Sequence, residues 1–224
     1  MAPFRVALLG AESTGKTQLA AALAAQARER GLTAIVVGEV LRAWCDAQGR
    51  TPRADEQRGI AQSQADQVAH APACDLLISD TTPLMVALYS DMLFSDPSLY
   101  PLALAHHALY DLTLVMGLDV PWVADGLQRD GPHVRAPVDA LLRLALARGG
   151  VAYSVVYGSG AARAANAWAC IERGMARRHD SPSTVRVENE DGAYRPWSCD
   201  KCSDPDCEHR LFSRLRAKSG SLNG

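Results

Sequence analysis

The chain has 224 residues, of which 48% are hydrophobic and 21% are charged, a balance that supports a full buried core and argues against global disorder. Its formal net charge of -2 argues against the basic surface typical of nucleic-acid-binding proteins. No apolar run is long enough for a signal peptide or a membrane span, so we expect a cytoplasmic protein that binds neither nucleic acid nor membrane.

Short apolar strands alternate with helices rich in alanine and leucine. Strands are predicted over residues 4–9, 33–37, 75–79, 112–116 and 151–157. Helices are predicted over residues 16–30, 40–47, 54–70, 84–93, 99–108, 138–148 and 161–175. This alternation predicts an α/β fold of three layers, in which a parallel five-stranded sheet is covered by helices on both faces.

The composition changes near residue 177, where charged residues, proline and serine replace the apolar pattern. We therefore expect two parts, an α/β domain over residues 1–176 and a short cysteine-rich polar tail over residues 177–224.

The sequence GAESTGKT follows the first strand directly and leads into a helix. It satisfies the pattern G-x-x-x-x-G-K-[ST] at every fixed position, in the strand-to-helix context that the motif requires. The two glycines let the backbone curl until successive N–H groups face phosphate oxygens, and the positive end of the helix adds to them. The lysine supplies a cation for the β- and γ-phosphates, and the threonine hydroxyl is a magnesium ligand. We therefore expect ATP and Mg²⁺ to bind a P-loop, in a P-loop NTPase fold, that consists of Gly10, Ala11, Glu12, Ser13, Thr14, Gly15, Lys16 and Thr17.

Two carboxylates follow neighbouring strands. Asp80 ends the third strand, where it is either the second magnesium-side ligand or a helix cap, a task that Thr81 or Thr82 also suits. Glu39 follows the second strand. It is either the base that accepts the proton of an attacking hydroxyl or an exposed glutamate at the start of a helix, where the helix dipole favours a negative charge. Arg42 shares its helical face and either holds Glu39 or binds substrate. The sequence leaves open whether Glu39 or Asp80 is the base.

Residues 119–137 are too polar and too rich in glycine to belong to the core, yet they contain Trp122, Arg129 and Arg135. A loop of this length is typically functional or disordered, so it is either a lid whose arginines close over the triphosphate or a solvated connection. Arg163 follows a glycine turn after the fifth strand, a position that often approaches the adenine in small P-loop kinases.

Three stretches of the chain resemble the ribosylnicotinamide kinase domain of NadR-type proteins. They are the P-loop GAESTGKT, the pair Glu39 and Arg42, and the pattern P-W-x-x-D-G-L at residues 121–127. The resemblance covers about residues 4–175. It departs at Gln128, where the related pattern has an arginine, and Arg129 follows one position later.

The resemblance implies ATP-dependent phosphorylation of the 5′-hydroxyl of nicotinamide riboside, a nucleoside-like small molecule. It also implies these residue roles: Lys16 and Thr17 serve ATP and magnesium, Asp80 and Glu39 serve the metal and the acceptor, and Trp122 and Asp125 belong to the substrate-side or lid segment. Because the P-loop begins at residue 10, no adenylyltransferase domain is expected before it. The oligomeric state stays open, a homo-oligomer included.

Near the end of the chain, three thiols and an imidazole fall within eleven residues, at Cys199, Cys202, Cys207 and His209. Zinc prefers four such ligands, and binding would order a tail with few apolar residues. Free thiols in a disordered tail and a redox pair are the alternatives. A zinc tail would also suit a different class of protein, a P-loop ATPase or nucleotide-dependent switch whose tail binds a partner.

Overall fold

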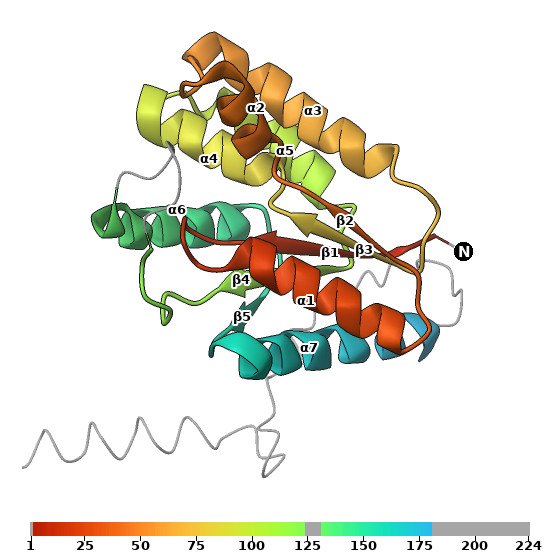
Figure 1. Cartoon of the computed structure of the whole chain (residues 1–224). Helices are drawn as coiled ribbons and strands as arrows, with labels where there is room; N and C mark the ends of the chain where they lie inside the picture. Colours follow the sequence, from red (N-terminus) through yellow and green to blue (C-terminus); the bar gives the residue numbers. More distant parts are fainter. Residues whose placement is uncertain (1, 124–130, 181–224) are drawn as a thin grey trace, which may run out of the picture. The chain divides into compact units, whose positions relative to one another are not determined.

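The structure is a computed structural model that describes residues 2–123 and 131–180 (Figure 1). Within these residues, the strands are β1 (Phe4–Leu9), β2 (Ala34–Val37), β3 (Leu76–Asp80), β4 (Leu112–Met116) and β5 (Ser154–Val156). The α-helices are α1 (Lys16–Glu29), α2 (Val40–Gln48), α3 (Gln57–Ala69), α4 (Pro83–Phe94), α5 (Tyr100–His107), α6 (Arg135–Arg148) and α7 (Gly160–Asp180). Short 3-10 helices are η1 (Ala54–Glu56), η2 (Pro97–Leu99) and η3 (Pro132–Val134).

The strands form one parallel sheet in the order β2-β3-β1-β4-β5. Helices α1 and α7 cover one face of this sheet, and α3, α4, α5 and α6 cover the other (Figure 1). The three-layer α/β prediction is therefore confirmed, with P-loop NTPase topology. Because all strands are parallel, their carboxyl ends meet at one edge of the sheet, where ligands of such folds bind.

Central strand β1 shows how the sequence pattern builds two cores. Phe4, Val6 and Leu8 pack into the core under α1 and α7, whereas Ala7 and Leu9 pack into the core on the opposite face. All five side chains are almost completely buried. This alternation follows from the two-residue period of a strand, and it explains why a strand buried on both faces is apolar apart from Arg5.

Two helices extend beyond their predicted ends. Helix α6 begins at Arg135 rather than at residue 138, because Pro137 lies in the first turn, where its missing N–H costs no helical hydrogen bond. Helix α7 continues to Asp180, although the composition becomes polar near residue 177. Arg178 donates hydrogen bonds to the carbonyl oxygens of Ala2 (3.1 Å) and Pro3 (2.9 Å), which tie the end of the helix to the start of β1.

A buried imidazole lies between α5 and β4. His107 is 2% exposed, and its Nε2 lies 2.9 Å from the Thr113 hydroxyl. The ring of Tyr110 lies 5.2 Å from the His107 ring, centroid to centroid. Burial lowers the pKa of His107 to about 4, and His106 adds to the shift. The imidazole is therefore neutral in the folded protein near pH 7.

We expect the free energy of unfolding to fall as the pH drops from 7 to 5, because the unfolded chain binds a proton at His107 that the folded chain does not. The His107 share of this fall is about 2 kcal/mol. Urea denaturation at both pH values measures it. The exposed control His70→Gln should keep the wild-type pH dependence and His107→Gln should lose this share; equal pH dependence in all three proteins would contradict the assignment.

Candidate functional site

The P-loop connects β1 to α1 and requires glycine at two positions. Gly10 has a φ of 148°, and an added Cβ would lie 2.9 Å from the Cβ of Met116 on β4. Gly15 is the N-cap of α1 with a φ of 78°, a left-handed conformation that glycine adopts without strain. Because glycine has no side chain to cap the helix, the first N–H groups of α1 face the loop.

Lys16 and Thr14 close the P-loop on itself. The Lys16 ammonium donates to the carbonyl oxygens of Gly10 and Ala11, both at 3.0 Å, and the Thr14 hydroxyl donates to Ala11 O at 2.7 Å. Both side chains are buried. The positive charge of the lysine therefore lies inside the loop, where backbone N–H groups and a helix N-terminus also attract an anion.

Thr17 and Asp80 form the polar contact between α1 and the end of β3. The Thr17 hydroxyl donates to Asp80 Oδ2 at 2.6 Å. Asp80 is 2% exposed, and its other oxygen, Oδ1, has no hydrogen-bond partner among the described residues. A buried carboxylate oxygen without a partner is costly unless a cation binds it. Mg²⁺ is typically held by one or two carboxylates together with substrate phosphates, so this hydroxyl and carboxylate fit that ion.

Glu39 and Arg42 lie together at the start of α2, beyond the end of β2. Glu39 is the N-cap residue of α2, and its Oε2 accepts a hydrogen bond from Arg42 Nε at 3.3 Å. The Glu39 side chain is 14% exposed, so this carboxylate is largely shielded yet reachable. Of the two alternatives for Arg42, the structure shows its contact with Glu39, and Arg42 also lines the pocket described below.

Arg163 lies at the start of α7 and connects three segments of backbone. Its guanidinium donates to the carbonyl oxygens of Thr14 (2.5 Å), Gly117 (3.1 Å) and Val156 (3.2 Å) and to Asp119 Oδ1 (3.0 Å). Burial lowers the pKa of the guanidinium, and Asp119 opposes that shift. Arg163 therefore holds the P-loop against the ends of β4 and β5.

Two P-loop side chains contact the segments on either side of residues 124–130. Glu12 Oε1 accepts hydrogen bonds from Trp122 Nε1 (3.4 Å) and from the Gly131 N–H (3.3 Å). The Ser13 hydroxyl donates to Val123 O (3.1 Å) and accepts from the Val123 N–H (2.8 Å). These contacts were not predicted, because they join residues about 110 positions apart and no local sequence pattern marks them.

Arg135 lies at the start of α6, where it is 8% exposed and donates to Val120 O at 2.9 Å. It supports the segment beside the P-loop from behind and does not line the pocket. Two other expected site residues, Asp125 and Arg129, lie outside the described residues.

The zinc ligands expected at Cys199, Cys202, Cys207 and His209 also lie outside the described residues, so that site stays a prediction. Within residues 2–123 and 131–180, no group of three or more histidine, cysteine, aspartate or glutamate side chains is arranged to hold a metal.

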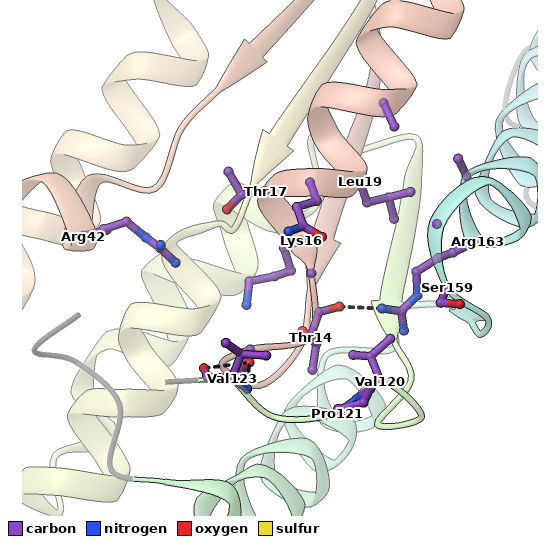
Figure 2. Close-up of a pocket in the computed structure, with 16 residues that line it drawn as sticks. Thr14, Lys16, Thr17, Leu19, Arg42, Val120, Pro121, Val123, Ser159 and Arg163 are labelled. Atoms are coloured by element: carbon purple, nitrogen blue, oxygen red, sulfur yellow. Dashed lines mark hydrogen bonds between the residues drawn. The ribbon is translucent and has the colours of Figure 1, made fainter. Parts of the chain in front are cut away.

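A pocket of about 650 Å³ opens along the P-loop (Figure 2), a volume typical of small-molecule sites. Figure 2 shows Lys16 and Thr17 on one side, Val120 and Val123 on another, and Arg163 at the right, hydrogen-bonded to Thr14. The lining residues come from the P-loop, α1, the segment after β4, the start of α7 and α2: Ser13, Thr14, Gly15, Lys16, Thr17, Gln18, Leu19, Ala22, Arg42, Val120, Pro121, Val123, Ser159, Gly160, Arg163 and Ala164.

A family model described as an AAA domain matches residues 5–163, which is most of the chain. The protein therefore belongs to this AAA-domain family of P-loop proteins.

Two solved structures share the fold of this chain. The crystal structure of NadR protein in complex with NR has a TM-score of 0.65 and 22% identity, over 78% of this chain and 52% of that chain. The crystal structure of NadR protein in complex with NAD and AMP-PNP has a TM-score of 0.58 and 20% identity, over 76% of this chain and 49% of that chain. This chain thus spans about half the length of those NadR chains.

A comparison with curated protein sequences gives no significant match.

Within the two described ranges, none of the helices is both long and apolar enough to cross a membrane.

We expect Arg163→Met to lower the free energy of unfolding by about 2–4 kcal/mol, because it removes four hydrogen bonds of a buried cation and leaves its carbonyl partners unpaired. Urea denaturation measures the loss. Arg163→Lys keeps the charge but lacks the planar guanidinium group. Its free energy of unfolding should lie between those of the wild type and Arg163→Met. The control Arg173→Met, on an exposed position of α7, should change stability by less than about 0.5 kcal/mol; an equal loss at Arg163 and Arg173 would contradict this interpretation.

Proposed function

We propose that this protein is a small-molecule kinase that transfers the γ-phosphoryl group of ATP to the 5′-hydroxyl of a riboside, with nicotinamide riboside as the leading acceptor. The observation that carries the proposal is the buried Asp80 carboxylate, which is hydrogen-bonded to Thr17 through one oxygen and whose second oxygen has no partner within residues 2–123 and 131–180. The resulting nicotinamide mononucleotide would place the reaction in a cytoplasmic step of NAD biosynthesis.

In this proposal the P-loop binds the triphosphate of ATP. An incoming phosphate offers Lys16 a stronger partner than the two carbonyl oxygens that it now contacts, because an ammonium group binds an anionic oxygen more strongly than a neutral carbonyl oxygen. The N–H groups at the start of α1 bind the same anion. Arg163 stays on Thr14 O and keeps the loop fixed while Lys16 moves. The NadR complex with AMP-PNP, an ATP analogue, supports a nucleoside triphosphate as the ligand.

Thr17 and Asp80 would hold Mg²⁺. When it is bound, the ion supplies positive charge for the phosphate oxygens as charge develops on them during transfer. The protein side of this site is set in advance, because the 2.6 Å hydrogen bond between Thr17 and Asp80 already fixes both ligand groups at one place.

In this proposal Glu39 acts on the acceptor hydroxyl. Strand β3 separates β2 from β1, so Glu39 lies about 10 Å across the sheet from the strand that carries the P-loop, at a spacing of about 4.8 Å per strand. That separation leaves room for an acceptor between Glu39 and the γ-phosphate. The acceptor oxygen forms a bond to phosphorus, the bond to the β-phosphate oxygen breaks, ADP leaves, and the hydroxyl proton passes to the Glu39 carboxylate.

The choice of base follows from the partners of the two carboxylates. Asp80 accepts the Thr17 hydroxyl and is assigned to the metal, so it is not available as a base. Glu39 is paired instead with Arg42, which lines the pocket. The NadR complex with NR supports the riboside as the acceptor class.

We expect Asp80→Asn to abolish stabilisation by Mg²⁺ and ATP, because the amide is a poor ligand for the ion. Thermal unfolding with and without Mg²⁺ and ATP measures it. Without ligand, the variant should be at least as stable as the wild type, because it removes a buried charge. Asp46→Asn, an exposed control on α2, should keep the full ligand-induced rise in Tm. An unchanged rise in Asp80→Asn would remove Asp80 from the metal site.

A panel of ribosides with ATP tests the activity itself. We expect riboside-dependent ADP release from the wild type, with nicotinamide riboside in the panel. Glu39→Gln should lower kcat by about 10²–10⁴-fold, because it removes the base, and should leave the Kd for ATP within about twofold. ADP release that no riboside stimulates would refute the kinase proposal. Full activity of Glu39→Gln would refute only the choice of base.

A further inference from the structure

A glutamine on α3 is hydrogen-bonded to the backbone on both sides of Glu39. Gln64 Oε1 accepts from the Val40 N–H at 2.9 Å, and Gln64 Nε2 donates to Gly38 O at 3.1 Å. The side chain is 0% exposed. A single amide group therefore fixes the residue before Glu39 and the residue after it.

One of these two contacts satisfies an N–H group at the start of α2. The first N–H groups of a helix have no partner within the helix, and the N-cap side chain usually satisfies one of them. Glu39 is the N-cap residue of α2, but its side chain makes no capping hydrogen bond. Gln64 instead satisfies the Val40 N–H from a different helix. The Glu39 carboxylate itself makes no capping hydrogen bond and accepts a hydrogen bond from Arg42.

Packing alone does not fix this junction. A Cβ added to Gly38 would meet no heavy atom within 4 Å, so no side-chain packing is available at that position. Val37 and Val40 pack against the cores, and hydrogen bonds hold the backbone at Gly38 between them. Gln64 supplies both a donor and an acceptor without charge, which neither glutamate nor methionine does.

We propose that Gln64 is a positioning residue for Glu39, which it holds in place by capping α2 in trans and by binding Gly38 O. This inference rests on the proposed function, in which Glu39 accepts the proton of the acceptor hydroxyl. Proton transfer and in-line attack depend steeply on geometry, and a displacement of about 1 Å can lower a rate by about 10²-fold. Loss of the Gln64 amide therefore lowers kcat through Glu39 and leaves ATP binding unchanged.

A double-mutant cycle tests this coupling. Gln64→Met keeps the shape of the side chain but removes both hydrogen bonds, and it should lower kcat at least tenfold while the Kd for ATP stays within twofold. In a Glu39→Gln background, Gln64→Met should lower the residual rate by less than twofold. The matched control Gln67→Met, an exposed glutamine on the same helix, should leave kcat unchanged.

The cycle separates a positioning role from a general structural one. Equal losses from Gln64→Met in the wild-type and Glu39→Gln backgrounds would overturn the proposal, as would no loss in the wild-type background. Amide hydrogen exchange measures the cap without any activity. Gln64→Met should reduce the protection of the Val40 amide at least tenfold, whereas Gln67→Met should not.

The two proposals fail in different ways. A wild-type protein that phosphorylates no riboside refutes the proposed function. Hydrogen exchange of the Val40 amide tests the Gln64 contact separately. Unchanged protection of this amide in Gln64→Met would contradict the cap on which the inference depends.

Discussion

The parallel pairing of β1 with β3 is the constraint on which the arrangement of the site depends. It sets Leu8 opposite Asp80, so that the strand before the P-loop and the strand that ends in the carboxylate stop at the same level. Thr17 then reaches Asp80 across a 2.6 Å hydrogen bond. A slip of one residue would turn the Asp80 side chain to the opposite face of the sheet. Because both strands are buried on two faces, such a slip would also move the apolar side chains of one strand from one core to the core on the opposite face, where they would not fit.

Two buried polar side chains, Arg163 and Gln64, hold the site in place. Arg163 fixes Thr14 O against the ends of β4 and β5, and Gln64 fixes the backbone beside Glu39. Both are buried polar side chains whose partners are mainly backbone carbonyl and N–H groups left over at the ends of strands and helices. Such groups must find partners once they are buried. Long polar side chains from neighbouring helices meet this requirement, and they thereby connect the loops that carry the P-loop and Glu39.

The regular elements and the P-loop could be predicted from the sequence because their signals are local. Strand β1 is an apolar run that ends in glycine, and the motif from Gly10 to Thr17 has fixed positions. The contacts of Glu12 with Trp122 and of Arg163 with Thr14 join residues more than 100 positions apart, so no spacing rule reveals them. Gln64 resembles any other glutamine of a polar helix, and only tertiary packing distinguishes it from the exposed Gln67. The start of α6 was misplaced because a proline is tolerated in the first turn of a helix, and the end of α7 was misplaced because the hydrogen bonds of Arg178 extend the helix into a polar segment.

The central claim is that the acceptor hydroxyl lies between the γ-phosphate on the P-loop and the carboxylate of Glu39. A crystal structure with Mg²⁺, a non-hydrolysable ATP analogue and nicotinamide riboside measures this arrangement directly. The account predicts that the 5′-hydroxyl lies within about 3.2 Å of a Glu39 oxygen, as proton transfer requires. It also predicts that the ion contacts Thr17 and Asp80. A riboside bound away from Glu39, or an ion bound without Asp80, would contradict the account.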